Sequence, residues 1–302
     1  MTPAVAIWPR EALRRRVADY VALGKPRVVA MVLVTTSVGY YLGSAGSPLL
    51  VPLAWTLAGT ALAAAGTLAL NQYMERDVDA RMERTRHRPL PDGRLRPAEA
   101  LAFGFALLVG GLGVLAVATN GLAAVVTAGI SVTYLLFYTP LKRVTSLCTL
   151  VGAIPGALPP LGGWTAAHGG IAAGGLALFA ILFVWQLPHS LAIAMLYKDD
   201  YARGGFRLLP VVDRSGVATA RQILAHCLVL LPLSLLPTML DVTGVVYFFG
   251  AALLGVGLTA FAVPILLDGS ARAARRMLLA SVVYLPVLLC LMAFDRTLPP
   301  LR

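Results

Sequence analysis

Charged side chains are scarce in this sequence. Only 13% of its 302 residues are Asp, Glu, Lys or Arg, whereas apolar residues make up 58% and the mean hydropathy is +0.79. A soluble domain carries about 25% charged residues, so this chain has too few polar groups to cover a globule in water. The composition therefore excludes an ordinary soluble fold.

Cysteine is equally sparse, and the common catalytic motifs are missing. Cys148, Cys227 and Cys290 stand alone in apolar runs, without the spacing of a disulfide framework or a metal site, so packing explains them. The sequence contains no GxxxxGK[ST], HExxH, CxxC or GxSxG pattern. These absences argue against a P-loop nucleotidase, a zinc protease and a serine hydrolase of the usual types.

What the chain does have is a series of apolar blocks of about 20 residues, long enough to cross a hydrocarbon core of about 30 Å. The alternating pattern of an outer-membrane barrel is absent. We predict an all-α polytopic membrane bundle of about nine transmembrane helices. The expected spans are 28–44, 52–72, 98–119, 122–139, 147–166, 171–196, 220–240, 243–267 and 277–294.

These spans define one transmembrane domain over residues 28–295. A basic interfacial arm, 1–27, precedes it, and a short tail, 296–302, follows it. No short apolar core with a cleavage site accompanies the arm, so the first span itself is expected to direct insertion. Gly and Pro inside several spans predict kinked helices around a central cavity, although close packing through small residues explains many of them equally well.

The positions of the basic residues predict the orientation. Of the 25 Lys and Arg residues, 22 lie before the first span or in the loops after spans two, four, six and eight, and Arg221 stands at the start of the seventh span. The positive-inside rule then places the N-terminus and the long loops 73–97 and 197–219 in the cytoplasm. We expect a bacterial inner-membrane protein, and the net charge of +11 reflects topology and lipid contact rather than nucleic-acid binding.

The first long loop begins with the strongest chemical signal. Asn71, Glu75 and Asp79 are spaced four residues apart, so a helix that continues through them carries all three on one face. Oxygen ligands in this arrangement suit Mg²⁺, which is usually held by one or two carboxylates together with substrate phosphates. Arg84 and Arg88 follow with cationic groups suited to phosphate oxygens. This pattern predicts a magnesium and diphosphate site at the edge of the membrane.

A second acidic group stands at the start of the other long loop. Asp199 and Asp200 end the sixth span, and Arg203 follows. An ordinary interfacial pair between Asp199 and Arg203 at i, i+4 explains them without function. If the two loops face each other, their carboxylates are expected to share two or more Mg²⁺ ions bridged by one diphosphate.

These motifs resemble those of a known family. Asn71-x-x-x-Glu75-x-x-x-Asp79, followed by Arg84 and Arg88, is similar to the NxxxDxxxD signature of the UbiA-type intramembrane prenyltransferases. Further stretches resemble one branch, the protoheme IX farnesyltransferases. They are Lys25-Pro26-Arg27, Tyr138-Thr139-Pro140-Leu141-Lys142-Arg143, Pro159-Pro160-Leu161-Gly162-Gly163-Trp164, Trp185-Gln186-Leu187-Pro188-His189, Asp199-Asp200-Tyr201-Ala202-Arg203-Gly204-Gly205 and Leu209-Pro210-Val211-Val212.

Two departures from the family pattern affect the expected metal site. Glu75 replaces the usual Asp, and its extra methylene still permits Mg²⁺ binding. Asp199-Asp200 lacks the fuller DxxxD motif of the quinone-forming branch. The number of ions at the second loop therefore stays open.

The resemblance implies a reaction and its residues. A farnesyl group passes from farnesyl diphosphate to a vinyl group of haem b, and water adds to give haem O, with Mg²⁺ as cofactor. The implied catalytic and metal-binding residues are Asn71, Glu75, Asp79, Asp199 and Asp200. The implied diphosphate-binding residues are Lys25, Arg27, Arg84, Arg88, Lys142 and Arg143. A downstream haem-modifying membrane enzyme is a possible recipient of the product.

The acceptor site and the function leave alternatives open. His189, inside the sixth span, and His226, in the seventh, are candidates for haem binding, because polar residues within membrane spans are often functional; a packing role explains either one as well. Prenylation of a quinone precursor or a chlorin uses the same chemistry. A transporter is a further alternative, but the first five spans carry no charge at their centres and the charges gather on one side.

Overall fold

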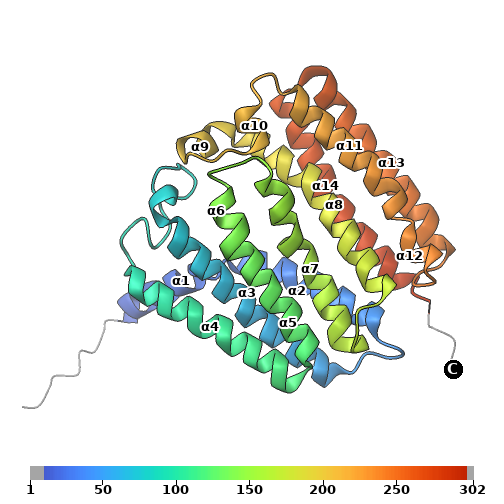
Figure 1. The fold of residues 1–302 in the computed structure, drawn as a ribbon, viewed down its shortest axis with the longest axis horizontal. Helices are drawn as coiled ribbons and strands as arrows, with labels where there is room; N and C mark the ends of the chain where they lie inside the picture. The colour runs from blue at the N-terminus through green and yellow to red at the C-terminus, as the bar shows by residue number, and fades with distance from the viewer. Residues whose placement is uncertain (1–9, 298–302) are drawn as a thin grey trace, which may run out of the picture.

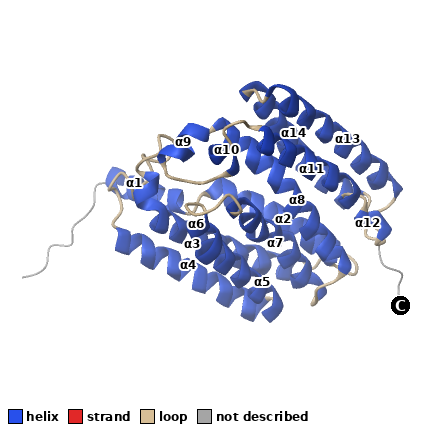
Figure 2. Ribbon diagram, turned by 45° about the horizontal axis from the view of Figure 1, so that its top comes forward, coloured by secondary structure: helices blue, strands red, loops and turns tan. Residues whose placement is uncertain are grey.

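The computed structural model describes residues 10–297, and their regular secondary structure is helical apart from one isolated bridge between Thr243 and Arg296 (Figures 1 and 2). The helices are α1 (Arg10–Leu23), α2 (Pro26–Gly43), α3 (Leu50–Asp79), α4 (Pro97–Ala118), α5 (Gly121–Val132), the π-helix η1 (Thr133–Tyr138), α6 (Thr139–Leu141), α7 (Cys148–His168), α8 (Ala173–Leu196), α9 (Lys198–Arg203), α10 (Leu209–Val212), α11 (Val217–Leu233), α12 (Leu236–Met239), α13 (Val245–Asp268) and α14 (Ala271–Phe294).

The predicted all-α membrane bundle is confirmed. Each expected span overlaps one long helical stretch, with α5, η1 and α6 forming one of them and α11 with α12 another. Among the described residues, seven helices are long and apolar enough to cross a membrane. The pair α1 and α2, bent by 48°, makes an eighth if it counts as one span. A count of nine spans and the side of the N-terminus therefore stay predictions. The predicted arm and tail fall partly outside the described residues.

The helices form a bundle with two flanks. Figure 1 shows α3, α4 and α5 on one side, α11, α13 and α14 on the other, and α7 and α8 between them. Behind α8, buried side chains of α11, α13 and α14 form an apolar cluster with Leu178, Ile181 and Leu182. That cluster fixes one face of α8 and leaves its other face for the centre of the bundle.

Close backbone contact holds α2 against α7. A Cβ atom on Gly39 would lie 1.9 Å from the carbonyl oxygen of Pro160, and one on Gly163 would lie 2.0 Å from that of Thr36. Small residues of this kind let membrane helices pack backbone to backbone. The contact fixes the positions of α2 and α7 relative to each other.

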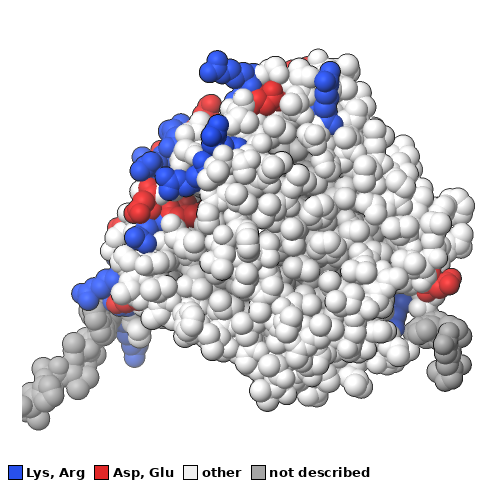
Figure 3. Space-filling view, in the orientation of Figure 1, with Lys and Arg blue, Asp and Glu red and all other residues white. Residues whose placement is uncertain are grey.

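Charged side chains gather at one end of the molecule. In the space-filling view they follow the edge that carries α1, α9 and α10, while most of the remaining visible surface is uncharged (Figure 3). The predicted loops 73–97 and 197–219 both lie at this end, so the alternation of basic loops in the sequence corresponds to one polar face.

Candidate functional site

The face of α3 that carries Asn71, Glu75 and Asp79 is buried at the polar end of the bundle. The helix runs without a break to Asp79, as expected from the spacing of these residues. The exposed fractions are 1% for Asn71, 7% for Glu75 and 1% for Asp79, whereas Asp77, which is off this face, is exposed. One helix therefore holds three oxygen-bearing side chains inside the protein.

Each of these side chains has a basic partner from a different segment. The pairs are Lys25 Nζ with Asn71 Oδ1 at 3.2 Å, Lys142 Nζ with Glu75 Oε1 at 2.8 Å and Arg88 Nη1 with Asp79 Oδ2 at 2.6 Å. We call these six residues the paired cluster. Since a buried charge without a partner costs several kcal/mol, the pairing explains how the carboxylates are tolerated there. The cluster offers oxygen ligands to a cation and ammonium and guanidinium groups to an anion.

Backbone geometry places the two lysines. Lys25 stands in the break between α1 and α2 with φ at 49°, and Gln72 Nε2 donates to the carbonyl oxygens of Ala22 and Leu23 just before it. Lys142 follows α6, and its carbonyl oxygen accepts a hydrogen bond of 2.7 Å from the backbone N–H of Arg207. Burial disfavours the charged form of Lys142, but nearby Tyr138 and Glu75 outweigh burial and raise its pKa, so it stays cationic.

The second loop contacts the first, as predicted, but through the backbone. Asp200 accepts hydrogen bonds from the N–H groups of Glu83 at 2.7 Å and Arg84 at 3.4 Å, and Arg203 Nη2 lies 2.7 Å from it. Burial acts to raise the pKa of Asp200, yet these hydrogen bonds prevail and lower it. Asp200 thus holds the first loop in place, while Asp199 is exposed.

A small apolar cluster strengthens the same contact. Val78, Met82 and Phe206 are buried against one another, and a Cβ atom on Gly204 would lie 3.0 Å from the Met82 sulfur. In residues 10–297, no three side chains of His, Cys, Asp or Glu come close enough to form a metal cage of their own. The two loops therefore meet through Asp200 and through this apolar cluster, and metal binding shared between their carboxylates stays a prediction.

The remaining predicted phosphate ligands lie outside the paired cluster. Arg84 is exposed, with its guanidinium carbon 5.7 Å from the ring centres of both Tyr197 and Tyr201. Arg27 and Arg143 are exposed as well. Thr139 accepts a hydrogen bond of 3.1 Å from Asn71 Nδ2. The sequence did not indicate this role, because Thr139 is uncharged and stands out only by its place beside Pro140 in a family motif.

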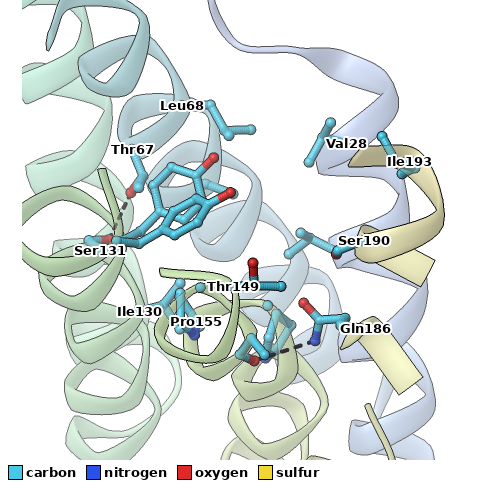
Figure 4. A pocket seen from close by; sticks show the side chains of 18 of the residues that line it. Val28, Thr67, Leu68, Ile130, Ser131, Thr149, Pro155, Gln186, Ser190 and Ile193 are labelled. Atoms are coloured by element: carbon cyan, nitrogen blue, oxygen red, sulfur yellow. Dashed lines mark hydrogen bonds between the residues drawn. The ribbon is translucent and has the colours of Figure 1, made fainter. Parts of the chain in front are cut away.

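A central cavity of about 390 Å³ begins beside the paired cluster and is formed mainly by α2, α3, α5, η1, α7 and α8 (Figure 4). Thr60, Ala64, Thr67 and Leu68 line it from the same face of α3 that carries Asn71. Most of its lining is apolar. The arrangement joins a charged site to an apolar chamber along a single helix.

Two tyrosines stand where the cavity meets the cluster. Tyr134 and Tyr138 both line the cavity, and their ring centres are 5.1 Å apart. They belong to the π-helix η1, a rare element that often marks functional sites. The Lys142 ammonium lies 4.3 Å from the centre of the Tyr138 ring. Aromatic faces are therefore available to a cation at this point.

The two candidate haem-binding histidines lie away from the cavity lining. His189 Nδ1 is 2.9 Å from Ser281 Oγ on α14, and its ring stacks on Trp185 with centres 4.8 Å apart. His226 is on α11, with Nδ1 2.7 Å from the carbonyl oxygen of Gln222. Gln186 and Ser190, on the neighbouring face of α8, line the cavity instead.

Comparison with known proteins shows the family. The sequence pattern of the UbiA prenyltransferase family matches residues 32–287. This chain belongs to that family. It is 46% identical to the protoheme IX farnesyltransferase of Solibacter usitatus over 92% of this chain and 98% of that protein, and 43% identical to that of Koribacter versatilis over 96% and 97%. It is thus a membrane prenyltransferase.

Solved structures show the same fold. A digeranylgeranylglyceryl phosphate synthase superposes with a TM-score of 0.79, at 16% identity over 93% of this chain and 98% of that one. A UbiA homologue from Archaeoglobus fulgidus bound to GPP and Mg²⁺ superposes with a TM-score of 0.63, at 16% identity over 91% and 99%. These likenesses establish the prenyltransferase fold for this chain.

The contact between the loops predicts a protease-sensitivity effect. In Asp200→Ala, the N–H groups of Glu83 and Arg84 lose their acceptor, so the first loop opens more often. We expect trypsin to cleave after Arg84 and Arg86 at least about threefold faster than in the unchanged protein. Limited proteolysis in detergent, read by mass spectrometry, measures this.

Asp199→Ala is the matched control, because it removes the neighbouring exposed carboxylate. Its cleavage rate is expected to equal that of the unchanged protein. Equal rates in both variants would contradict the bracing role of Asp200.

Proposed function

We propose that this protein transfers a farnesyl group from farnesyl diphosphate to a vinyl group of haem b, with addition of water, to give haem O and diphosphate. The observation that carries the proposal is the paired cluster at the mouth of an apolar cavity, which matches a substrate with an anionic head and a hydrocarbon tail. The names of the full-length relatives support haem b as the acceptor.

The paired cluster fits Mg²⁺ and a diphosphate together. Amide and carboxylate oxygens are the ligands that Mg²⁺ prefers, and one or two carboxylates suffice when substrate phosphates supply the rest. We assign metal binding to Asn71, Glu75 and Asp79, with Asp199 and Asp200 as further candidates. Mg²⁺ bound there neutralises charge on the leaving diphosphate. A homologue of the same fold bound to GPP and Mg²⁺ supports Mg²⁺ as the ion.

The cations of the cluster are the proposed diphosphate ligands. Lys25, Lys142 and Arg88 exchange their present oxygen partners for phosphate oxygens, and exposed Arg84, Arg27 and Arg143 are candidates at the outer side. The exchange keeps every buried charge paired. It also concentrates positive charge where the diphosphate becomes more negative during bond cleavage.

The reaction itself needs no strong nucleophile. The bond between farnesyl C1 and the diphosphate oxygen breaks, and its electron pair leaves with the diphosphate. The vinyl carbon of haem b supplies the electron pair of the new carbon–carbon bond. Water then captures the cation beside the porphyrin ring and loses a proton. The faces of Tyr134 and Tyr138 stabilise the allylic cation, and the apolar lining excludes bulk water from it.

We assign haem binding first to His189, whose hydrogen bonds fix its tautomer. Ser281 Oγ donates to the carbonyl oxygen of Leu278 at 2.7 Å, so it accepts from His189 Nδ1–H at 2.9 Å. Nε2 then keeps its lone pair, the form that binds iron. His226 is the second candidate, since its Nδ1–H donates to a backbone carbonyl in the same way.

The setting of the enzyme follows from the same proposal. The basic residues at the polar end support an active site on the cytoplasmic side of a bacterial inner membrane. The product then passes to a downstream haem-modifying membrane enzyme. Another aromatic acceptor, such as a quinone precursor or a chlorin, is the alternative, because the paired cluster recognises only the donor.

An assay with two acceptors tests the function. Detergent-purified protein receives farnesyl diphosphate, Mg²⁺ and either haem b or 4-hydroxybenzoate, and mass spectrometry identifies the products. We expect a hydroxyethylfarnesyl porphyrin from haem b and no prenylated benzoate. Product from the benzoate alone would refute the haem assignment and leave the prenyl transfer intact.

The metal assignment predicts a contrast between two aspartates on α3. Asp79→Asn weakens a charged ligand on the buried face, and we expect turnover to fall by at least about 100-fold, the scale of losing one preorganised electrostatic contact. Asp77→Asn changes an exposed carboxylate off that face and is expected to keep turnover within about twofold. Steady-state assays measure both, and full activity in Asp79→Asn would remove Asp79 from the site.

The haem assignment predicts a spectroscopic change. Protein purified with haem b is expected to show a Soret band shifted from that of free haem, and His189→Ala to lose the shift because Nε2 no longer binds iron. His168→Ala, at the end of α7, serves as the control and keeps it. Size-exclusion profiles establish that both variants stay folded. If the Soret shift persists in His189→Ala and is lost in His226→Ala, the haem ligand is His226 on α11 instead.

A further inference from the structure

The cavity continues the ligand face of α3 towards the opposite side of the membrane. Thr60, Ala64 and Leu68 line the cavity, and Asn71 and Glu75 follow on the same face, closer to the loops. A donor held by its diphosphate at the paired cluster therefore has its hydrocarbon tail directed along α3 towards Thr60.

Buried and half-buried side chains line the far end of the cavity. Four lining residues lie farthest from the polar loops on their own helices: Thr60 on α3, Thr127 on α5, Pro159 on α7 and Gln186 on α8. Thr60 is 6% exposed and Thr127 is 7% exposed. We call these four residues the floor.

Hydrogen bonds and close contacts hold the floor rigid. Thr127 Oγ1 donates to the carbonyl oxygen of Ala123 at 2.9 Å, and Gln186 Nε2 donates to that of Leu182 at 3.0 Å. A Cβ atom on Gly156 would lie 1.9 Å from Gln186 Oε1, so the amide packs directly on the α7 backbone. The floor therefore cannot recede easily before a longer chain.

The depth of the cavity matches three isoprene units. At a rise of about 1.5 Å per residue, Ala64 lies about 10 Å from Asn71 along α3, and Thr60 lies about 16 Å from it. An extended isoprene unit spans about 5 Å, because it contributes four chain bonds of about 1.5 Å each in a zigzag. Two units reach the level of Ala64, and the third fills the space between Ala64 and Thr60.

We propose that the floor selects the length of the prenyl donor, and that Ala64 is the position whose small side chain admits the third isoprene unit. This inference rests on the proposed function and adds a specificity determinant to it. A donor with four units meets Thr60 and Thr127 before its diphosphate reaches the paired cluster. A donor with two units leaves the floor unfilled.

The test is a graded series at Ala64. Ala64→Val, Ala64→Leu and Ala64→Phe are assayed with haem b, Mg²⁺ and geranyl, farnesyl or geranylgeranyl diphosphate. We expect kcat/KM for farnesyl diphosphate to fall stepwise with side-chain size, by at least about tenfold in Ala64→Phe. The reason is that one methylene group too many in a hydrophobic pocket already costs about tenfold or more. The value for geranyl diphosphate is expected to stay within about threefold of the unchanged protein.

Two further variants complete the design. Ala58→Phe adds the same bulk to an exposed position of α3 and is expected to keep the donor preference of the unchanged protein. Thr60→Ala lowers the floor, and it is expected to raise kcat/KM for geranylgeranyl relative to farnesyl diphosphate by at least about threefold. Thr60→Ala removes bulk, so it still tests the proposal if the larger Ala64 variants fail to fold.

The possible results distinguish a failure of the proposed function from a failure of the floor. No transfer from any donor by the unchanged protein would refute the proposed function itself. Two results would overturn the role of the floor alone. One is a fall in transfer that is equal for all donors in the Ala64 series. The other is a preference among the donors that stays unchanged in both that series and Thr60→Ala.

Discussion

The compensation of buried charge at the mouth of the cavity is the constraint on which the rest of the structure depends. Glu75 and Asp79 lie inside the bundle and are tolerated because Lys142 and Arg88 reach them from other segments. Removing one partner of such a pair leaves an uncompensated charge, at a cost of about 3–5 kcal/mol. The need to avoid this cost brings Lys142, 67 positions from Glu75, and Arg88 of the following loop onto one face of α3.

The same contacts suit the ligands of the proposed function. A diphosphate with Mg²⁺ carries both signs of charge, so in that proposal it replaces each internal pair with an external one and leaves no group alone. The apolar walls behind the cluster are held separately, by the close packing of Gly39 and Gly163 and by the core behind α8. Charge pairing thus acts at the mouth, and packing determines the shape of the chamber.

Local patterns were readable from the sequence, and long-range pairings were not. The spacing of Asn71, Glu75 and Asp79 predicted their common face because helical periodicity is a local property. Lys25 and Lys142 were included only through family resemblance, since no spacing links residues 46 and 67 positions apart. The direction of His189 towards α14 was also beyond prediction, because a helix that is apolar all round gives no sign of which face meets which neighbour.

The π-helix η1 gives the fourth long helical stretch one residue more per turn than its neighbours, and this register has a consequence for evolution. Deleting a single residue within 133–138 would rotate everything after it by about 100° and carry Lys142 away from Glu75. Insertions and deletions are harmless in most loops, but this segment carries Tyr134 and Tyr138 of the cavity lining and determines where Lys142 lies relative to Glu75. Descendants of this chain are thus constrained in length here, even where the side chains themselves are free to vary.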